Sequence, residues 1–463
     1  MGFCDATEAI PLPERFAQLK DKLVQGKEIA LLESWRRLLQ ALREEIDHIS
    51  AAGSRTIPTI SHDDLGNPVI AARFSKELKR SGAAVIRRVV SERDASSWEQ
   101  DTREYLTSNP YTKGFPADNP QLFELFWSPA QLKARAHPRI LTTQRLAMGF
   151  WDSGCGTMPV SSRLPVTYAD RVRRRTPGDT TFFPHPHMDS GSVERWEPNG
   201  YGQSGTYQAI FDGHWEDYNP WDVSRRCKIN NDLYAGADTC TMFRMFQGFL
   251  ALSPIAPGEG SLRICPMLKL STAYLPLRPL FSPICANTPF FLDPSNWRLE
   301  HPLQNSILHG ALPSYTQEIS DILHPHLQLK RSLVSLPALR PGDYVIWHPD
   351  AIHAGDSVQS GLTAATVFYI PACPLSQINA LYLARQRKAF LLGSPAPDFE
   401  GGAGESYHIG RPGVAEVSEA GGEAALRAMG LLPWDEDEAH DQEEAALVRM
   451  ANALLFPERF GLV

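Results

Sequence analysis

Two short segments far apart in the sequence constrain most strongly what this chain can fold into. FFPHPHMDS carries His187 and Asp189, and HPDAIHAGD carries His353. In an extended strand, side chains at positions i and i+2 point to the same face, so the first segment presents an imidazole and a carboxylate together. A fold that brings His353 beside them completes a two-histidine, one-carboxylate set. That set is typical of Fe(II) sites that keep coordination positions open for oxygen chemistry.

Two other histidines compete for the ligand positions. His185 shares strand parity with His187, and His348 stands shortly before His353. We favour His353 over His348, because His348 ends a strand ahead of Pro349 and the ligand is expected after the following turn. A His-x-Asp pair is weak evidence by itself, since histidines on half-polar strands more often make ordinary hydrogen bonds.

The middle of the chain has the pattern of a β-rich fold. From about residue 168 to 371, short apolar and β-branched runs alternate with clusters of Gly, Pro, Asn and Asp. This pattern predicts a sandwich or barrel, and in a jelly roll strands distant in sequence become neighbours. Helical periodicity flanks it at about 14–49, 91–106, 129–149, 377–392 and 438–455. We therefore predict a mainly β core with α-helices, in three regions: 1–167 helical with the first strands, 168–375 the barrel, and 376–463 a helical extension.

Composition narrows the classes of partner. The chain of 463 residues has a net charge of −8, with 43% hydrophobic and 21% charged residues. An acidic chain does not favour nucleic acid as the main partner. No apolar run reaches the roughly 20 residues that span a bilayer. The seven cysteines are scattered, which predicts a reduced, cytoplasmic compartment. Nothing in the sequence predicts the oligomeric state.

One basic run interrupts this acidic background. Arg171, Arg173, Arg174 and Arg175 lie almost consecutively. Such a run is usually a solvated loop, so we expect no functional role for it.

Several further segments carry a resemblance to a known family. They are HMD, FRMFQGFLALS, GEGSLRICP, LRPGDYVIWHPDAIHAGD, VFYIPACPLSQIN and PAPDF. Together they resemble an uncharacterised-domain family of Fe(II)/2-oxoglutarate oxygenases, related to the phytanoyl-CoA hydroxylase group. The resemblance implies a double-stranded β-helix, a cupin-like jelly-roll barrel wrapped by helices. It also implies His187, Asp189 and His353 as the Fe(II) ligands, 2-oxoglutarate as co-substrate and O2 as oxidant.

The chain departs from that family pattern after His353. Many such oxygenases place an arginine about ten residues later to bind the C5 carboxylate of 2-oxoglutarate, whereas SVQSGLTAATVFYIP has no Arg or Lys. A carboxylate in an apolar barrel needs a cation or several hydrogen bonds. Arg244 and Arg263 lie in apolar strands and are the inward candidates, although each could instead form a structural ion pair or point outward. Thr363 and Thr366 could add hydroxyl contacts.

We therefore predict a non-haem iron, 2-oxoglutarate-dependent dioxygenase that oxidises a small polar metabolite. The resemblance makes an amino acid in secondary metabolism a plausible substrate, by hydroxylation, desaturation or oxidative cyclisation. One alternative is a cupin-type metalloenzyme that uses the same triad without 2-oxoglutarate, which the missing late arginine favours. A second alternative is a non-enzymatic binding module on a degenerate barrel, which the intact triad disfavours.

Overall fold

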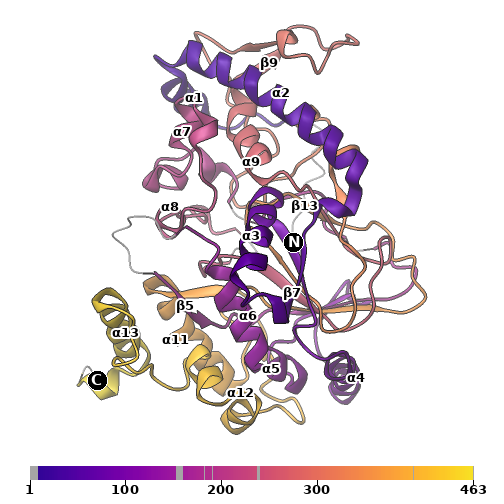
Figure 1. Cartoon of the computed structure of the whole chain (residues 1–463), viewed down its shortest axis with the longest axis vertical. Helices are drawn as coiled ribbons and strands as arrows, with labels where there is room; N and C mark the ends of the chain where they lie inside the picture. Colours follow the sequence, from indigo (N-terminus) through magenta and orange to yellow (C-terminus); the bar gives the residue numbers. More distant parts are fainter. Residues whose placement is uncertain are drawn as a thin grey trace.

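A layer of β-sheet separates two groups of helices. The structure is a computed structural model and describes residues 9–152, 160–181, 183–189, 191–236, 240–399 and 401–461. Figure 1 shows α1 (Arg15–Val24) and α2 (Glu28–Ala52) at one end of the molecule. The helices α11 (Gln377–Leu392), α12 (Val414–Ala428) and α13 (Gln442–Leu455) lie at the opposite end.

The largest sheet has eight strands in the order β1-β2-β12-β7-β14-β6-β4-β3. Its neighbouring strands are antiparallel except for β1 and β2, which run parallel. The strands, in sheet order, are β1 (Thr59–Ser61), β2 (Ala83–Arg87), β12 (Tyr344–Trp347), β7 (Gln247–Ala251), β14 (Ala365–Tyr369), β6 (Val172–Arg175), β4 (Leu122–Phe123) and β3 (Gly114–Phe115). The central strands are buried on both faces, and consecutive apolar residues of β2, β7 and β12 supply much of the main hydrophobic core.

A second antiparallel sheet has the order β11-β8-β13, formed by β11 (Val334–Ser335), β8 (Leu262–Ile264) and β13 (His353–Gly355). His187 extends this sheet through an antiparallel bridge to His353. Two further pairs join β10 (Trp297–Leu299) to β9 (Phe281–Pro283), and β15 (Cys373–Ser376) to β5 (Val160–Val166). The fold is thus mixed α/β with a large, mainly antiparallel sheet. Among the described residues, the strands do not form a single closed sheet, so the predicted barrel is reproduced only as separate sheets.

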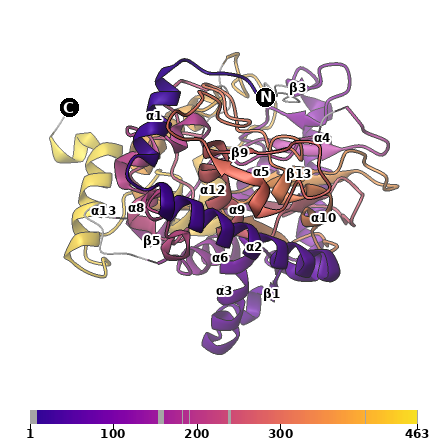
Figure 2. The ribbon, with the colours of Figure 1, turned by 90° about the horizontal axis from the view of Figure 1, so that it is seen from above.

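The helical segment predicted at about 14–49 is confirmed as two helices, α1 and α2. Gly26 takes a positive φ of 76° between α1 and α2, a conformation that glycine adopts without steric cost. Trp35 of α2 is fully buried and stacks on Tyr274 of α9 (Leu268–Leu277), with ring centroids 5.5 Å apart. Figure 2 shows α2 crossing the molecule near α9.

The predicted helix at 129–149 is two helices, α5 (Pro129–Ala136) and α6 (Pro138–Met148). His137 stands between them with ψ of 127°, because the residue before a proline is disfavoured in the helical region. By contrast, α4 (Glu92–Ser108) begins as predicted, and the side chain of its N-cap Ser91 accepts a hydrogen bond from the Asp94 backbone N–H. The remaining helices are α3 (Pro68–Ser81), α7 (Gln208–Phe211), α8 (Val223–Arg226) and α10 (Leu329–Ser332).

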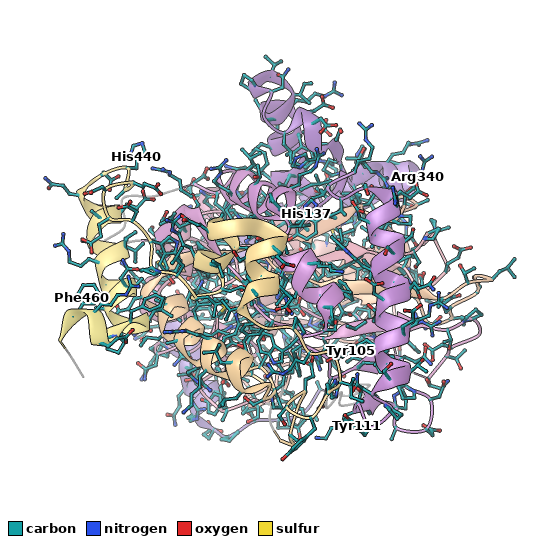
Figure 3. The ribbon with its side chains drawn as sticks, turned by 90° about the horizontal axis from the view of Figure 1, so that it is seen from below. Tyr105, Tyr111, His137, Arg340, His440 and Phe460 are labelled. Atoms are coloured by element: carbon teal, nitrogen blue, oxygen red, sulfur yellow. The ribbon has the colours of Figure 1, made fainter. Side chains whose placement is uncertain are left out.

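The C-terminal helices flank one side of the sheets. Figure 3 shows α13 at the edge of the molecule, between the labelled His440 and Phe460. The predicted helix at 377–392 is confirmed as α11, and the last predicted helix begins four residues late, at Gln442. Strands from region 1–167 join the same large sheet as strands from 168–375, so the three regions stay a prediction. No helix among the described residues has the length and apolar character to cross a membrane.

Candidate functional site

The structure brings His187, Asp189 and His353 together. Their possible ligand atoms all lie within 4.8 Å of one another, and this is the one such cluster of His, Cys, Asp or Glu among the described residues. The Nε2 atom of His187 lies 3.4 Å from Asp189 Oδ1, and that of His353 lies 3.5 Å from Asp189 Oδ2. Both histidines are only 4% exposed. The predicted parity of the His-x-Asp pair and the choice of His353 therefore agree with the geometry.

Backbone carbonyls fix the orientation of both imidazoles. His187 Nδ1 lies 2.7 Å from the carbonyl oxygen of His185, and His353 Nδ1 lies 2.9 Å from that of Ala351. A carbonyl oxygen only accepts hydrogen bonds, so each Nδ1 must carry the proton. In a neutral ring this leaves Nε2, the nitrogen nearer to Asp189, with a lone pair that can bind a metal ion. This arrangement, with the far nitrogen held by a carbonyl, is the one found for histidines that bind metals.

The electrostatics of the cluster keep the carboxylate ionised. Burial acts to raise the pKa of Asp189, but the nearby His353 and the hydrogen bond and charge of His187 hold it well below its usual range. Burial lowers the pKa of His353 to about 4, against the opposing charge of Asp189. Burial also acts to lower the pKa of His187, but the interactions with Asp189 and with the backbone of His185 and His353 together outweigh burial and raise this pKa. The group thus has an anionic oxygen donor and a neutral His353, as a divalent cation requires.

Trp347 supports the carboxylate from β12. Its indole Nε1 donates to Asp189 Oδ2 at 3.2 Å, and its ring lies 5.3 Å from the His353 ring. Trp347 is 5% exposed, so it is part of the buried core and also contacts the site. Gln247 stands opposite Trp347 in the neighbouring strand β7.

The triad lies in the wall of a cavity of about 540 Å³. One side of the cavity comes from the large sheet, through Phe249, Val367 and Tyr369. The other side comes from the smaller sheet, through Leu262 and His353. The site therefore lies between the two antiparallel sheets, with apolar side chains next to the candidate ligands. A cavity of this volume accommodates small molecules.

Two residues of the basic run line this cavity, which corrects our expectation of a solvated loop. The run forms strand β6, where Arg173 is 8% exposed and faces the cavity. Arg171 lies over the ring of Phe399, with its guanidinium carbon 4.6 Å from the centroid, and also lines the cavity. Arg174, on the opposite face, pairs with Glu99 at 3.5 Å. Alternation along a strand therefore divides the run between two faces.

Arg173 stands directly opposite Val367 in β14. Directly opposed residues of an antiparallel pair project to the same face, with Cβ atoms roughly 5 Å apart. Strand β14 follows His353 in the sequence and includes part of the segment that has neither Arg nor Lys. The sheet thus puts the guanidinium of Arg173 beside β14, a strand that has no Arg or Lys of its own.

The four residues predicted to contact the co-substrate have different positions. Arg244 lines the cavity, and its guanidinium carbon lies 5.7 Å from the centroid of the Tyr168 ring. Arg263 is not part of the lining; it alternates with Leu262, which is, and its Nη2 donates to the carbonyl of Leu333 at 3.1 Å. Thr363 is exposed, and Thr366 is buried against Glu99 at 3.5 Å. The structure does not bring Arg263 or either threonine into the cavity.

His348 has a structural environment away from the triad. Its Nε2 donates to the carbonyl of Pro220 at 3.0 Å, and its Nδ1 accepts from the backbone N–H of Asp350. The ring stacks on Trp151 at 4.8 Å. Asp350, which is fully buried, pairs with Arg195 at 3.4 Å and with Arg226. This network fixes the turn that leads into His353.

The donor set fits a metal ion of the Fe(II) type. Two imidazole nitrogens and one carboxylate converge from one side, and the cavity leaves the other side open. The protein already holds each donor group in place: Trp347 donates a hydrogen bond to Asp189, and backbone carbonyls accept from both Nδ1 atoms. The residues that would hold the ion are therefore oriented by the protein itself.

Comparison with known proteins places the chain in a family. The profile of the Gig2-like family matches residues 10–431. The uncharacterised protein YbiU of Escherichia coli K12 is 29% identical over 399 residues, which cover 84% of this chain and 88% of YbiU.

Two solved structures are similar along almost their whole length. GlcNAc Inducible Gene 2 (GIG2, DUF1479) of Candida albicans has 27% identity and a TM-score of 0.86, covering 97% of this chain and 96% of its own. A Salmonella typhimurium LT2 protein, whose name assigns it provisionally to the oxidoreductases, has 27% identity and a TM-score of 0.74, covering 90% and 98%. From the extent of the family match, this chain belongs to the Gig2-like family.

Proposed function

We propose that this protein is an Fe(II)- and 2-oxoglutarate-dependent oxygenase that acts on a small polar metabolite. The observation that carries the proposal is the convergence of His187, Asp189 and His353 in the wall of a cavity of about 540 Å³. Fe(II) binds this ligand set in oxygenases and leaves positions for a co-substrate and O2.

The strand arrangement supports the same proposal. Strands β6-β14-β7-β12 form four neighbours within the large sheet, and the strand at His187 continues β13-β8-β11 in the smaller sheet. Two four-stranded antiparallel sheets enclosing a site correspond to the eight strands of a jelly roll. The double-stranded β-helix is thus our interpretation of these two sheets.

We propose Arg173 as the residue that binds the C5 carboxylate of 2-oxoglutarate. It lines the cavity beside Val367 and is almost fully buried. A guanidinium can bind a carboxylate through two parallel hydrogen bonds, which are strong where water is excluded. Of the two arginines expected from the sequence, Arg263 lies outside the cavity lining, and Arg244 lines the cavity beside Tyr168.

The protein's own contribution to the reaction is to position the metal ligands and to limit the access of water to the cavity. Bound Fe(II) with 2-oxoglutarate supplies the oxidation of a substrate C–H bond by O2, with succinate and CO2 as co-products. Trp347 holds the Asp189 carboxylate toward both imidazoles. Apolar side chains including Phe249, Leu262 and Val367 exclude water from the cavity.

The rival proposal was a cupin-type metalloenzyme without 2-oxoglutarate, which rested on the missing cation after His353. Arg173 supplies a cation beside that place, so the main reason for the rival is weakened. We therefore retain 2-oxoglutarate as the proposed co-substrate.

Anaerobic titration of the metal-free full-length protein tests the function. Fe(II) should bind at one equivalent, and added 2-oxoglutarate should produce the visible charge-transfer band of an Fe(II) chelate. After admission of O2, succinate should form in step with oxygen consumption, even slowly without the substrate. Fe(II) binding with no band and no succinate would support the cupin alternative, and no metal binding would contradict both.

A further inference from the structure

Arg244 stands between two hollows of the protein. It lines the main cavity and also a smaller recess of about 70 Å³. Asp189 and Gln247 line both hollows as well. The recess therefore lies beside Asp189, the candidate carboxylate ligand.

Among the residues that the structure describes, no acidic side chain pairs with the Arg244 guanidinium, which makes no ion pair and no side-chain hydrogen bond there. The carboxylates that line the cavity are engaged elsewhere: Asp170 with Arg171 at 3.4 Å, and Asp398 with the Tyr168 hydroxyl at 3.0 Å. Asp189 is held by the two imidazoles and Trp347. The charges of Asp189 and Asp170 act on the Arg244 guanidinium through space, but neither accepts a hydrogen bond from it among the described residues, so its donors can bind an external anion.

Two further side chains that line the recess each have a buried donor without a hydrogen-bond partner among the described residues. Gln247 is 4% exposed, and its Nε2 has no hydrogen-bond partner among the described residues. Arg226 also lines the recess, and its buried Nε likewise has no partner there. Buried donors are rarely left unpaired, and a carboxylate offers only acceptor atoms. The three side chains thus have the chemistry that a carboxylate would satisfy.

Resting on the proposed function, we propose that the primary substrate carries a carboxylate, which binds Arg244 and Gln247 at the mouth of the recess. Arg173 then serves 2-oxoglutarate and Arg244 serves the substrate, so each anion has its own guanidinium. The recess holds a group of only a few heavy atoms, and the rest of the substrate extends into the main cavity beside the triad.

Binding measurements without turnover test this assignment. The full-length protein is loaded with Zn(II), which cannot support oxidation, and saturated with 2-oxoglutarate. The probes are matched pairs that differ in the carboxylate: propionate and propionamide, benzoate and benzamide, L-leucine and L-leucinamide. Phenyl phosphate is a third arm for anion type. Calorimetry gives the dissociation constants for the wild type, Arg244→Met, Gln247→Leu and the control Arg263→Met, whose side chain lies outside the cavity lining.

At least one carboxylate should bind the wild type more tightly than its amide. Arg244→Met should weaken that binding about 10- to 150-fold, the loss of one charged hydrogen-bonded contact, and leave 2-oxoglutarate binding within about twofold. Gln247→Leu should weaken it less, and Arg263→Met should not change it.

Four outcomes would overturn the assignment. They are equal binding of acids and amides, preference for phenyl phosphate, unchanged carboxylate binding in Arg244→Met, or no carboxylate binding at all. A selective loss of 2-oxoglutarate in Arg244→Met would instead make it the co-substrate residue. If Zn(II) or 2-oxoglutarate fails to bind the wild type, the proposed function fails, and this is seen before any probe is added.

Discussion

His187 and His353 exchange both of their backbone hydrogen bonds, each 3.0 Å long, so the two residues form a directly paired rung between strands. The pairing sets their ring centroids 4.3 Å apart. The relative position of the two imidazoles is thus determined by the backbone, and the side chains have only to choose a rotamer. A site built this way is organised before any ligand arrives.

Replacing His187, Asp189 or His353 with Ala should each abolish tight Fe(II) binding, because an octahedral ion loses one of three protein ligands. His348→Ala is the matched control: it removes a buried histidine but should retain one equivalent of Fe(II), with reduced thermal stability. Metal analysis after gel filtration, with circular dichroism for the fold, measures both. Retention of iron by His353→Ala together with its loss in His348→Ala would reverse the assignment.

Moving the arginine across the sheet should move the co-substrate site with it. Arg173→Val should weaken 2-oxoglutarate binding on the order of 10- to 1000-fold, equivalent to about 1.4–4 kcal/mol. Adding Val367→Arg should restore part of this affinity, because the two positions are directly opposed. Titration of the Fe(II) charge-transfer band gives the affinities. Unchanged affinity in Arg173→Val, with the fold intact, would exclude Arg173 as the anchor.

Trp347→Phe should keep an aromatic ring in the position of the indole and remove the hydrogen bond that the indole donates to Asp189. Partners of this kind typically contribute 10- to 100-fold in metal affinity or activity. We expect a loss in that range for Fe(II), measured by competition with a chelator. Phe249 packs against Trp347, with ring centroids 6.0 Å apart, and has no hydrogen-bonding side chain that could hold a ligand. Phe249→Leu should therefore leave iron affinity nearly unchanged, and an equal loss in both variants would mean that packing alone is responsible.

Asp350→Asn should destabilise the protein strongly, because Arg195 and Arg226 would remain buried without their carboxylate. Breaking a buried pair in this way costs about 3–5 kcal/mol. The exposed pair between Arg37 and Glu216 is the control, and Glu216→Gln should cost less than about 1 kcal/mol. Urea denaturation of the variants measures the difference. Similar losses in both would contradict a special role for the buried network.

Glu405 should make the protein less stable as pH rises. Burial raises its pKa to about 7, although the backbone N–H groups of Phe126 and Trp127 act to lower it. The folded state therefore retains a proton that the unfolded chain loses above about pH 4.5, so this contribution is complete below that pH and is lost as pH rises through about 7.

Between pH 5 and 8 the wild type should lose on the order of 3 kcal/mol more stability than Glu405→Gln, because each tenfold difference in proton affinity between the folded and unfolded states is worth about 1.4 kcal/mol. The other titrating groups are the same in both proteins, so their contributions to the pH dependence of stability cancel in the difference. Urea denaturation across this pH range measures both profiles. Parallel stability profiles for the two would show that Glu405 titrates near its usual pKa when folded.

The sequence predicted the triad because strand parity is a local property. The single-residue spacing of His187 and Asp189 places both on one face, and the turn after His348 singles out His353. Local signals also located most helices, such as α4 with its N-cap Ser91. The break at His137 was available from the sequence too, since Pro138 follows it.

Residues that depend on strand pairing were not predictable in this way. The basic run resembles a solvated loop when its charges are counted together. Only the pairing of β6 with β4 and β14 buries Arg173 and separates it from Arg174. The one available sequence signal for a strand was Val172, an apolar residue between Arg171 and Arg173. In the structure Val172 is fully buried. The inward position expected for Arg263 was not predictable either, since an apolar run does not indicate which face of β8 meets the cavity.

The pairing of Arg173 with Val367 also has a consequence for how such chains diverge. Two opposed positions can each supply the same positive charge, so a lineage can transfer it from one strand to the other without losing the site. Across homologous chains, positions 173 and 367 should then covary, with a basic residue at one and an apolar residue at the other. A survey that requires the cation at a fixed distance along the chain would overlook every member that carries it on the neighbouring strand.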